Sequence, residues 1–479
     1  MINNFLNLNL AFAIVLIVAS FFLIIGLFVS TKNFSLNSYL VSNRNVGFFN
    51  LSGSLIASAL GAWILFGPPT AATWGGLGSV FGYALGAASP MILLIFFGKK
   101  LRKAFPQGRT LTEIILKKFG ANFFKFIFLL MNFYLFIFLC AEITAISKLT
   151  YYISGLSIWI SAFIILFFTL TYVLYGGLKA TIKTDAIQFI IIILLFFYLL
   201  FTIVLRNNAS LNLNFFQEGF VKYDMKSLTT SFQFGFVFFI AVAATNLFHQ
   251  GNWQRVYAAK NKTVLINSLL AAFIIIFFIV FFMGLSGTIA QLNNLKFNED
   301  LAFFSIILDK KNVLVSIFIL IFALCLAIST VDTLLNSISS LIIVHKKDFS
   351  FFRKEKTKKF SNIILIFLSS VCFCIVLYQL SVLYLFLLAD LLCCTCAYVV
   401  FKGLYQKKIS SFRSFALVIS GLCFGLLFFP DPTFSKSLLI GVLLDKNILN
   451  GIFANSLLFW SFLFATFLPV FFDFLLKKK

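Results

Sequence analysis

The stretch ASALGAWILFGPPTAATWGG, residues 57–76, interrupts an apolar segment with residues that break helices. The interrupting residues are Gly61, Gly67, Pro68 and Pro69. Proline removes a backbone donor and glycine loosens the hydrogen-bond ladder, so carbonyl groups are freed. Freed backbone survives at membrane depth only where it is buried in protein or lines a cavity. We therefore expect a broken helix beside a cavity.

A second apolar segment is interrupted in a similar way. The stretch AVAATNLFHQGNWQRVYAAK, residues 241–260, places Asn246, His249, Gln250 and Gly251 late in a crossing. The two stretches lie five spans apart, so two five-helix units of opposite orientation can be drawn. Broken helices in corresponding positions of two halves are typical of a transport site. The alternative is that these residues only kink packed helices.

The composition indicates an integral membrane protein. The chain has 479 residues, of which 61% are hydrophobic and only 11% are charged, far less charge than a soluble protein carries. A spanning helix needs about 20 apolar residues. The sequence predicts thirteen spans: 8–30, 48–74, 77–98, 120–147, 150–174, 184–205, 231–254, 264–290, 313–344, 361–378, 380–402, 413–430 and 453–474. The first span lacks the preceding basic residues of a secretory signal.

The basic residues predict the orientation of the chain. The net charge is +23, and 29 of the 38 lysines and arginines fall in alternate loops that begin after the first span. Basic loops remain in the cytoplasm, so the N-terminus is expected outside and the C-terminus in the cytoplasm, as in a bacterial-type plasma membrane. Short loops between spans exclude a nucleic-acid-binding domain. Some of these side chains should contact anionic lipid headgroups.

Four acidic residues lie in or beside predicted spans. They are Glu142, Asp185, Asp332 and Asp390. Lys148 lies beyond Glu142, and we expect the two to form an ion pair; Asp390 has no obvious partner and should face the protein interior. The eight cysteines all fall in spans and the chain has only two histidines, so no metal centre or enzyme active site is predicted.

Polar residues crowd the apolar stretch ALCLAISTVDTLLNSIS, residues 323–339. Such groups are costly in lipid unless they face a cavity or a partner. Leu326 and Ser329 are three residues apart and share a helix face, and Asp332 lies one turn further on the same face. The alternative is that the hydroxyl groups bond to carbonyls one turn earlier.

Four ordered motifs resemble those of the solute:sodium symporter family. They are SYLVSNRNVGFFNLSGSLIASALGAW (38–63), YGGLKATIKTDAIQ (175–188), NWQRVYAAK (252–260) and STVDTLLNSISS (329–340). The resemblance implies an all-α membrane fold with a leucine-transporter-like 5+5 inverted repeat. Its halves would be residues 48–205 and 231–402 of a single transporter domain, with an extra helix at 8–30 and two more helices within 413–474.

The resemblance also implies a sodium ion between the second and ninth spans. Its ligands would be the carbonyls of Ala57, Leu60 and Leu326 and the hydroxyls of Ser329 and Thr330. Asp185 would lie on the ion pathway, although DAIQ also fits a capping box with Gln188. Asp332 would either bias the site electrostatically or anchor its helix. Ala59 stands where some members of the family carry an aspartate, which leaves the ion affinity open.

The substrate cavity is expected beside the two helix breaks. Its predicted lining is Trp63, Gly67, Asn246, His249 and Gln250, although His249 is also compatible with simple packing. Such a lining suits a small polar nutrient such as an amino acid, a urea-like solute or a carboxylate. The sequence thus predicts sodium-coupled import. The alternatives are a proton-coupled permease of the same fold or a membrane sensor, and a sensor is disfavoured because no signalling domain is fused. The oligomeric state is not readable.

Overall fold

The computed structural model describes residues 5–30, 35–206, 225–293, 299–308, 312–348, 357–406, 410–440 and 456–476. Within these residues the regular structure is helical. The long helices are α1 (Leu8–Val29), α3 (Phe48–Ala59), α4 (Gly67–Ala104), α6 (Ala121–Ser154), α7 (Ile158–Arg206), α9 (Met225–Phe248), α11 (Lys262–Leu292), α13 (Val313–His345), α14 (Thr357–Val376), α15 (Val382–Gly403), α16 (Ser411–Phe428) and α18 (Ser456–Leu475). The short ones are α2 (Leu36–Val41), α5 (Leu111–Phe119), α10 (Gln250–Ala258), α12 (Ala302–Ile307), η1 (Ser42–Arg44), η2 (Ala62–Leu65), η3 (Glu299–Leu301) and η4 (Lys346–Asp348).

The helices agree with the thirteen predicted crossings. Eleven helices of the described chain are long and apolar enough to span a membrane. One of them, α7, bends at Gly177, where φ is +54°, and holds two predicted spans. The remaining predicted span, 48–74, is divided among α3, η2 and the first part of α4, which bends at Gly75 and Gly76.

Some predicted boundaries are wrong. Helix α6 continues to Ser154 and ends at Gly155, whose φ is +74°. The next crossing therefore begins at Ile158 rather than at residue 150. Apolar and polar residues are mixed throughout this junction (148–158), so hydropathy alone does not mark the end of the helix, whereas a glycine in the left-handed conformation ends it. The short helices α2, α5, α10 and α12 were also not predicted.

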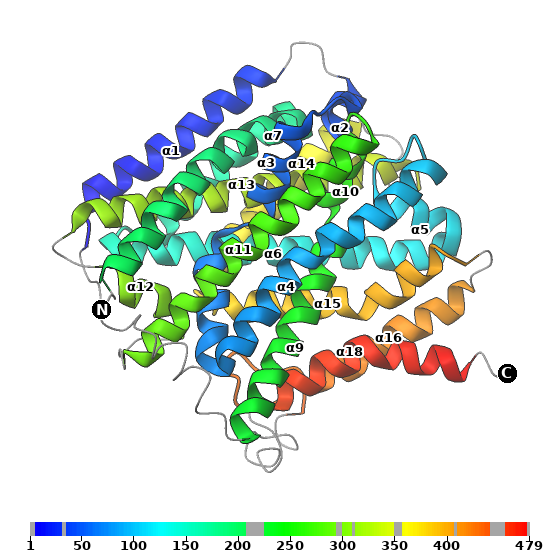
Figure 1. Cartoon of the computed structure of the whole chain (residues 1–479). Coiled ribbons are helices and arrows are strands. Elements are labelled where there is room, and N and C mark those ends of the chain that lie inside the picture. Colours follow the sequence, from blue (N-terminus) through cyan, green and yellow to red (C-terminus); the bar gives the residue numbers. More distant parts are fainter. Residues whose placement is uncertain are drawn as a thin grey trace.

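Burial separates a central group of helices from a peripheral one. Helices α13 and α15 are buried along most of their length, whereas most residues of α1, α14 and α16 are half-buried or exposed. In Figure 1, α1 lies along one edge of the bundle and α16 and α18 lie near the opposite edge. The exposed faces carry large apolar side chains such as Phe28 and Phe412, which is the pattern expected against lipid. The core that positions the site is therefore built from α3, α6, α13 and α15.

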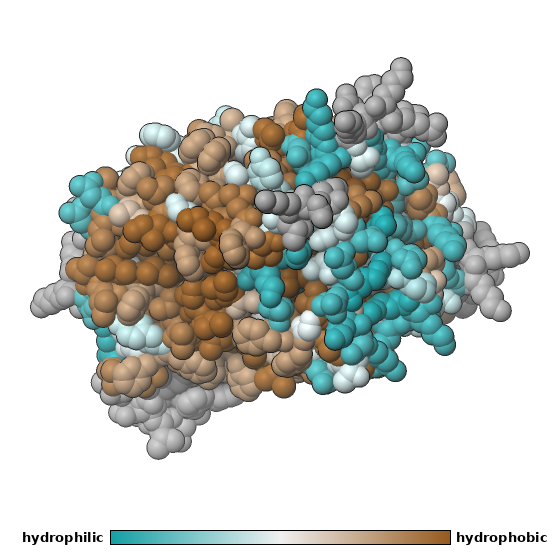
Figure 2. Space-filling view, turned by 90° about the horizontal axis from the view of Figure 1, so that it is seen from above, coloured by the Kyte–Doolittle hydropathy of each residue, from teal (hydrophilic) through white to brown (hydrophobic). Residues whose placement is uncertain are grey.

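The predicted cytoplasmic segments gather at one end of the bundle. Arg44 donates to the carbonyl of Gly108 at 2.9 Å, and Arg102 donates to that of Ala259 at 3.0 Å. Lys118 donates to the carbonyl of Gln406 at 2.9 Å. Figure 2 shows hydrophilic side chains on the side of the molecule where α2 and α5 lie, and a largely hydrophobic surface beside them. The assignment of this end to the cytoplasm and the boundaries of the two repeats stay predictions.

Candidate functional site

The first helix break lies between α3 and η2. Leu60 and Gly61 leave the helical conformation, with ψ angles of 84° and −179°. The carboxylate of Glu142, on α6, accepts a hydrogen bond from the amide of Ala62 at 2.8 Å. A Cβ on Gly61 would collide with this carboxylate. Glu142 therefore satisfies a buried backbone amide that the break leaves without a helical partner.

The expected ion pair between Glu142 and Lys148 is wrong. Lys148 donates instead to the carbonyl of Leu380 at 2.8 Å. The two residues are close in sequence, but that does not bring their side chains together. On a helix, residues six apart point to different sides, since neighbours on a face are three or four apart.

The second helix break lies at His249, between α9 and α10. The ring of His249 caps α10, since its Nδ1 accepts from the amide of Gly251 at 3.1 Å. Asn252 and Trp253 then donate to the carbonyls of Asn246 and Leu247, at 2.8 and 2.9 Å. Side chains of α10 thus satisfy carbonyls that the break leaves free, as the membrane interior requires.

The predicted sodium ligands lie on packed elements of the core. Ala57 and Leu60 are fully buried at the end of α3, and α3 contacts α13, which carries Leu326, Ser329 and Thr330. Ser329 does not bond to its own helix but donates to Asp185 at 2.6 Å. The Thr330 hydroxyl is buried and has no hydrogen-bond partner among the described residues. A buried hydroxyl without a partner is costly, so this position suits a bound cation.

Asp185 is the centre of a buried hydrogen-bond network. It accepts from Ser54 at 2.5 Å and forms an ion pair with Arg255 at 2.7 Å. Arg255 also donates to Ser54 and Thr333, at 2.7 and 2.8 Å. Both charged side chains are fully buried. The network joins α3, α7, α10 and α13 on the predicted cytoplasmic side of the break.

The predicted capping box at DAIQ is wrong. The helical segment begins after Gly177, so Asp185 lies two turns inside it rather than at its start. The Gln188 side chain is buried and unpartnered within the described chain. Asp332, the second predicted pathway residue, accepts from Tyr172 at 2.5 Å and from Thr184 at 3.2 Å. These bonds tie α13 to α7 and are compatible with either role predicted for Asp332.

A small cavity of about 20 Å³ lies beside both helix breaks. It brings together two of the predicted substrate residues, Trp63 and Asn246. Its other lining residues are Tyr83, Phe138, Val242, Thr245, Phe386 and Asp390. A Cβ on Gly67 would collide with the Tyr83 hydroxyl, so Gly67 supports this wall from behind.

The remaining two predicted substrate residues do not line this cavity. His249 stands behind Phe138, with 6.4 Å between the ring centroids. Gln250 donates to the carbonyl of Arg109 and to Ser340, each at 3.3 Å. Sequence reasoning missed Arg255, Tyr83, Phe138 and Phe386 as site residues. Of these, only Arg255 could have been found from the sequence, because it lies in the motif NWQRVYAAK. The three aromatic residues are not distinguished from the many other aromatic residues of the chain.

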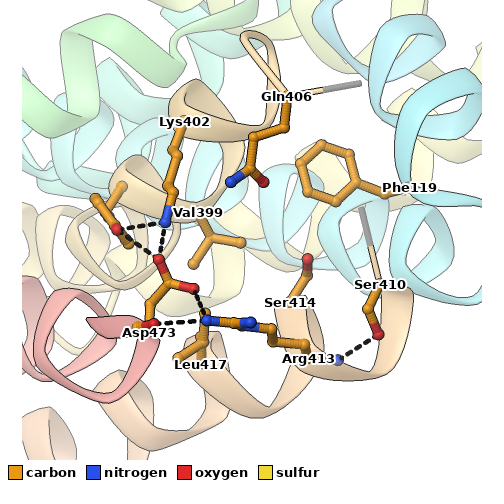
Figure 3. A pocket seen from close by; sticks show the side chains of 10 residues that line it. Phe119, Val399, Lys402, Gln406, Ser410, Arg413, Ser414, Leu417 and Asp473 are labelled. Carbon is orange, nitrogen blue, oxygen red and sulfur yellow. Dashed lines mark hydrogen bonds and ion pairs between the residues drawn. The ribbon is translucent and has the colours of Figure 1, made fainter. Parts of the chain in front are cut away.

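A larger cavity of about 400 Å³ lies between α15, α16 and α18 (Figure 3). Its charged side chains bind one another: Asp473 forms ion pairs with Lys402 and with Arg413, the latter at 2.7 Å. Tyr398 donates to the same carboxylate at 2.7 Å. This cluster holds α18 against α15 and α16, at a distance from the helix breaks.

The fold and the paired helix breaks define a secondary transporter embedded in the membrane by many crossings. The profile of the Sodium:solute symporter family matches residues 39–421, and the chain belongs to that family. The spermidine transporter DUR31 of Candida albicans (strain SC5314 / ATCC MYA-2876) is 25% identical over 415 residues, which are 86% of this chain and 78% of that protein.

Solved structures support the same fold. A Na⁺-coupled sialic acid symporter superposes with a TM-score of 0.69 at 16% identity, over 96% of this chain and 98% of that one. Mhp1, a nucleobase-cation-symport-1 family transporter, gives a TM-score of 0.51 at 15% identity, over 92% and 94% of the two chains. The predicted all-α fold with an inverted-repeat core is thus confirmed. Membership of the symporter family confirms the separate prediction that the protein is a transporter and not an enzyme.

Proposed function

We propose that the chain imports a small polar organic solute together with sodium by alternating access. The observation that carries this proposal is the buried, unpartnered hydroxyl of Thr330 on the helix packed against the end of α3. The ligands would be the hydroxyls of Ser329 and Thr330 and the carbonyls of Ala57, Leu60 and Leu326. Hard cations prefer such oxygen atoms. In this arrangement Asp185 orients Ser329 through the 2.6 Å bond that it accepts.

The network around Asp185 would link the ion to the end of the bundle that we predict to be cytoplasmic. Sodium would hold α3 and α13 together, while Arg255 joins Ser54 on α3 to Thr333 on α13 through the same guanidinium. Inward opening must separate α3 from α13, which breaks both sets of contacts. Release of the ion therefore accompanies release of the solute from the cavity beside Trp63.

The driving force is sufficient for accumulation. One positive charge that enters through the membrane releases about 2.3 kcal/mol per 100 mV. A tenfold sodium gradient adds about 1.4 kcal/mol. Together these correspond to an accumulation of the order of several hundredfold for a neutral solute.

The first prediction concerns the two hydroxyls. The double substitution Ser329→Ala with Thr330→Ala should abolish sodium-driven uptake by the reconstituted protein, because it removes both side-chain ligands. Uptake is measured in proteoliposomes with an inward sodium gradient and with potassium in its place. The matched control is Thr171→Ala with Ser370→Ala, two hydroxyls that bond only to their own helices. Sodium-driven uptake at the unmodified rate in the first variant would contradict the proposed site.

A proton-coupled permease is the alternative. Asp332 and Asp390 are buried acids that could carry the proton. That alternative predicts uptake driven by an inward proton gradient in potassium buffer without sodium. The bacterial-type plasma membrane also stays a prediction, and the named relative comes from a yeast.

A further inference from the structure

We infer that the solute is an organic cation with a protonated amine, and that Asp390 binds its ammonium group. This inference rests on the proposed function and specifies the substrate class of the same cavity. It starts from the charge of the cavity beside Trp63. Asp390 carries the one carboxyl group among the residues that line it, and none of these residues is basic.

Asp390 lacks a basic partner in the described part of the chain. No ion pair there reaches Asp390: Arg255 pairs with Asp185 and His345 with Asp348. The buried ring of His249 caps α10 by accepting from the amide of Gly251. Within the described residues Asp390 accepts one hydrogen bond, from the Thr245 hydroxyl at 2.5 Å. The side chain is only 5% exposed. An isolated carboxylate at this depth is strongly disfavoured, so a cationic solute would supply the missing partner.

The walls of the cavity suit a cation as well. Trp63 stacks on Tyr83 with 5.5 Å between ring centroids, and Phe138 meets Phe386 edge to face at 4.8 Å. Aromatic faces carry partial negative charge and attract ammonium groups within about 6 Å. The Asn246 side chain adds an amide oxygen at the rim. A volume of about 20 Å³ admits a group the size of water or ammonium, and the cavity must widen for a carbon chain.

A carboxylate solute is disfavoured by the same geometry. Helix N-termini are the usual sites for such an anion in broken helices, but after each break one backbone amide already donates to a side chain. The amide of Ala62 donates to Glu142, and the amide of Gly251 donates to His249. A carboxylate in the cavity would also face the like charge of Asp390. Of the polar nutrients considered from the sequence, the geometry therefore disfavours a carboxylate and favours a solute that carries an amine.

A matched set of four-carbon solutes tests the inference. Putrescine, succinamide and succinate have the same length and carry positive, no and negative charge. Binding to the purified full-length protein is followed by the shift in thermal unfolding temperature in sodium buffer, and uptake is followed in proteoliposomes. We expect putrescine to bind and to be transported, and the other two to do neither. A charge-assisted hydrogen bond corresponds to roughly a 10- to 150-fold change in affinity, so Asp390→Asn should weaken putrescine binding at least tenfold.

The controls separate this inference from the proposed function. Asp348→Asn changes an acid outside the cavity and should leave putrescine affinity unchanged. Sodium alone should stabilise both wild type and Asp390→Asn, which shows that the variant is folded and keeps its ion site. The inference is overturned if succinate or succinamide binds in place of putrescine. It is also overturned if Asp390→Asn leaves the affinity for putrescine unchanged. Neither result would contradict sodium coupling. If sodium neither raised the unfolding temperature of the wild type nor drove its uptake of putrescine, the proposed function would be overturned instead.

Discussion

Single residues at the helix breaks decide whether the core can form. Gly61 is required for space rather than for backbone conformation, since its φ of −83° is open to any residue. Sequence reasoning located this break because glycine and proline are visible in an apolar stretch. It could not identify Glu142 as the group that satisfies the break, because the two lie 80 residues apart and only the fold brings them together.

Gly61→Ala should therefore destabilise the protein. The added methyl group collides with the Glu142 carboxylate, and overpacking of a close-packed site costs typically about 1–3 kcal/mol. The expected result is a lower thermal unfolding temperature and loss of sodium-driven uptake. Gly47→Ala is the matched control, because a Cβ there meets no atom within 4 Å. Equal unfolding temperatures for the two variants would contradict the steric role of Gly61.

At the scale of elements, hydropathy predicted the crossings but not their connections. Long apolar runs such as α11 were located within a few residues because length and composition define them. The short helix α5 was not predicted because its nine residues are too few to span a membrane and include charged side chains. Its Thr110–Glu113 capping box is nevertheless visible in the sequence. The contacts between elements were beyond prediction: the motif containing Arg255 was recognised, but its partner Asp185 lies on another helix.

The Asp185–Arg255 pair offers a direct test of how α7 and α10 are coupled. Removal of one partner leaves a buried charge unpaired, which costs roughly 3–5 kcal/mol. We expect Asp185→Asn and Arg255→Gln each to lower the free energy of unfolding strongly. The double variant should lose much less of this free energy than the sum of the two single losses. Denaturation of all four proteins in one detergent gives the coupling energy. Additive losses would show that the two side chains do not act as a pair, despite their 2.7 Å separation.

At the scale of the whole molecule, the basic residues and the lipid-facing surface define how the protein sits in the membrane. Segments predicted to be cytoplasmic come together in the structure although they are far apart in sequence. For example, the Oγ1 atom of Thr112 lies 2.7 Å from the Nε2 atom of His345. This clustering agrees with a common side for these loops. The assignment of that side to the cytoplasm depends on the positive-inside bias alone.

Cysteine labelling in intact cells tests the orientation. Lys103 lies at the end of α4 that we predict to be cytoplasmic, and Thr433 lies in the loop after α16 that we predict to be outside; both side chains are exposed. A membrane-impermeant maleimide should label Thr433→Cys in intact cells, and should label Lys103→Cys only after permeabilisation. Wild type is the blank, because its eight native cysteines lie within membrane-spanning helices. Labelling of Lys103→Cys in intact cells would show that the orientation is the opposite of the one predicted. The Asp185–Arg255 network would then lie on the outer side of the cavity.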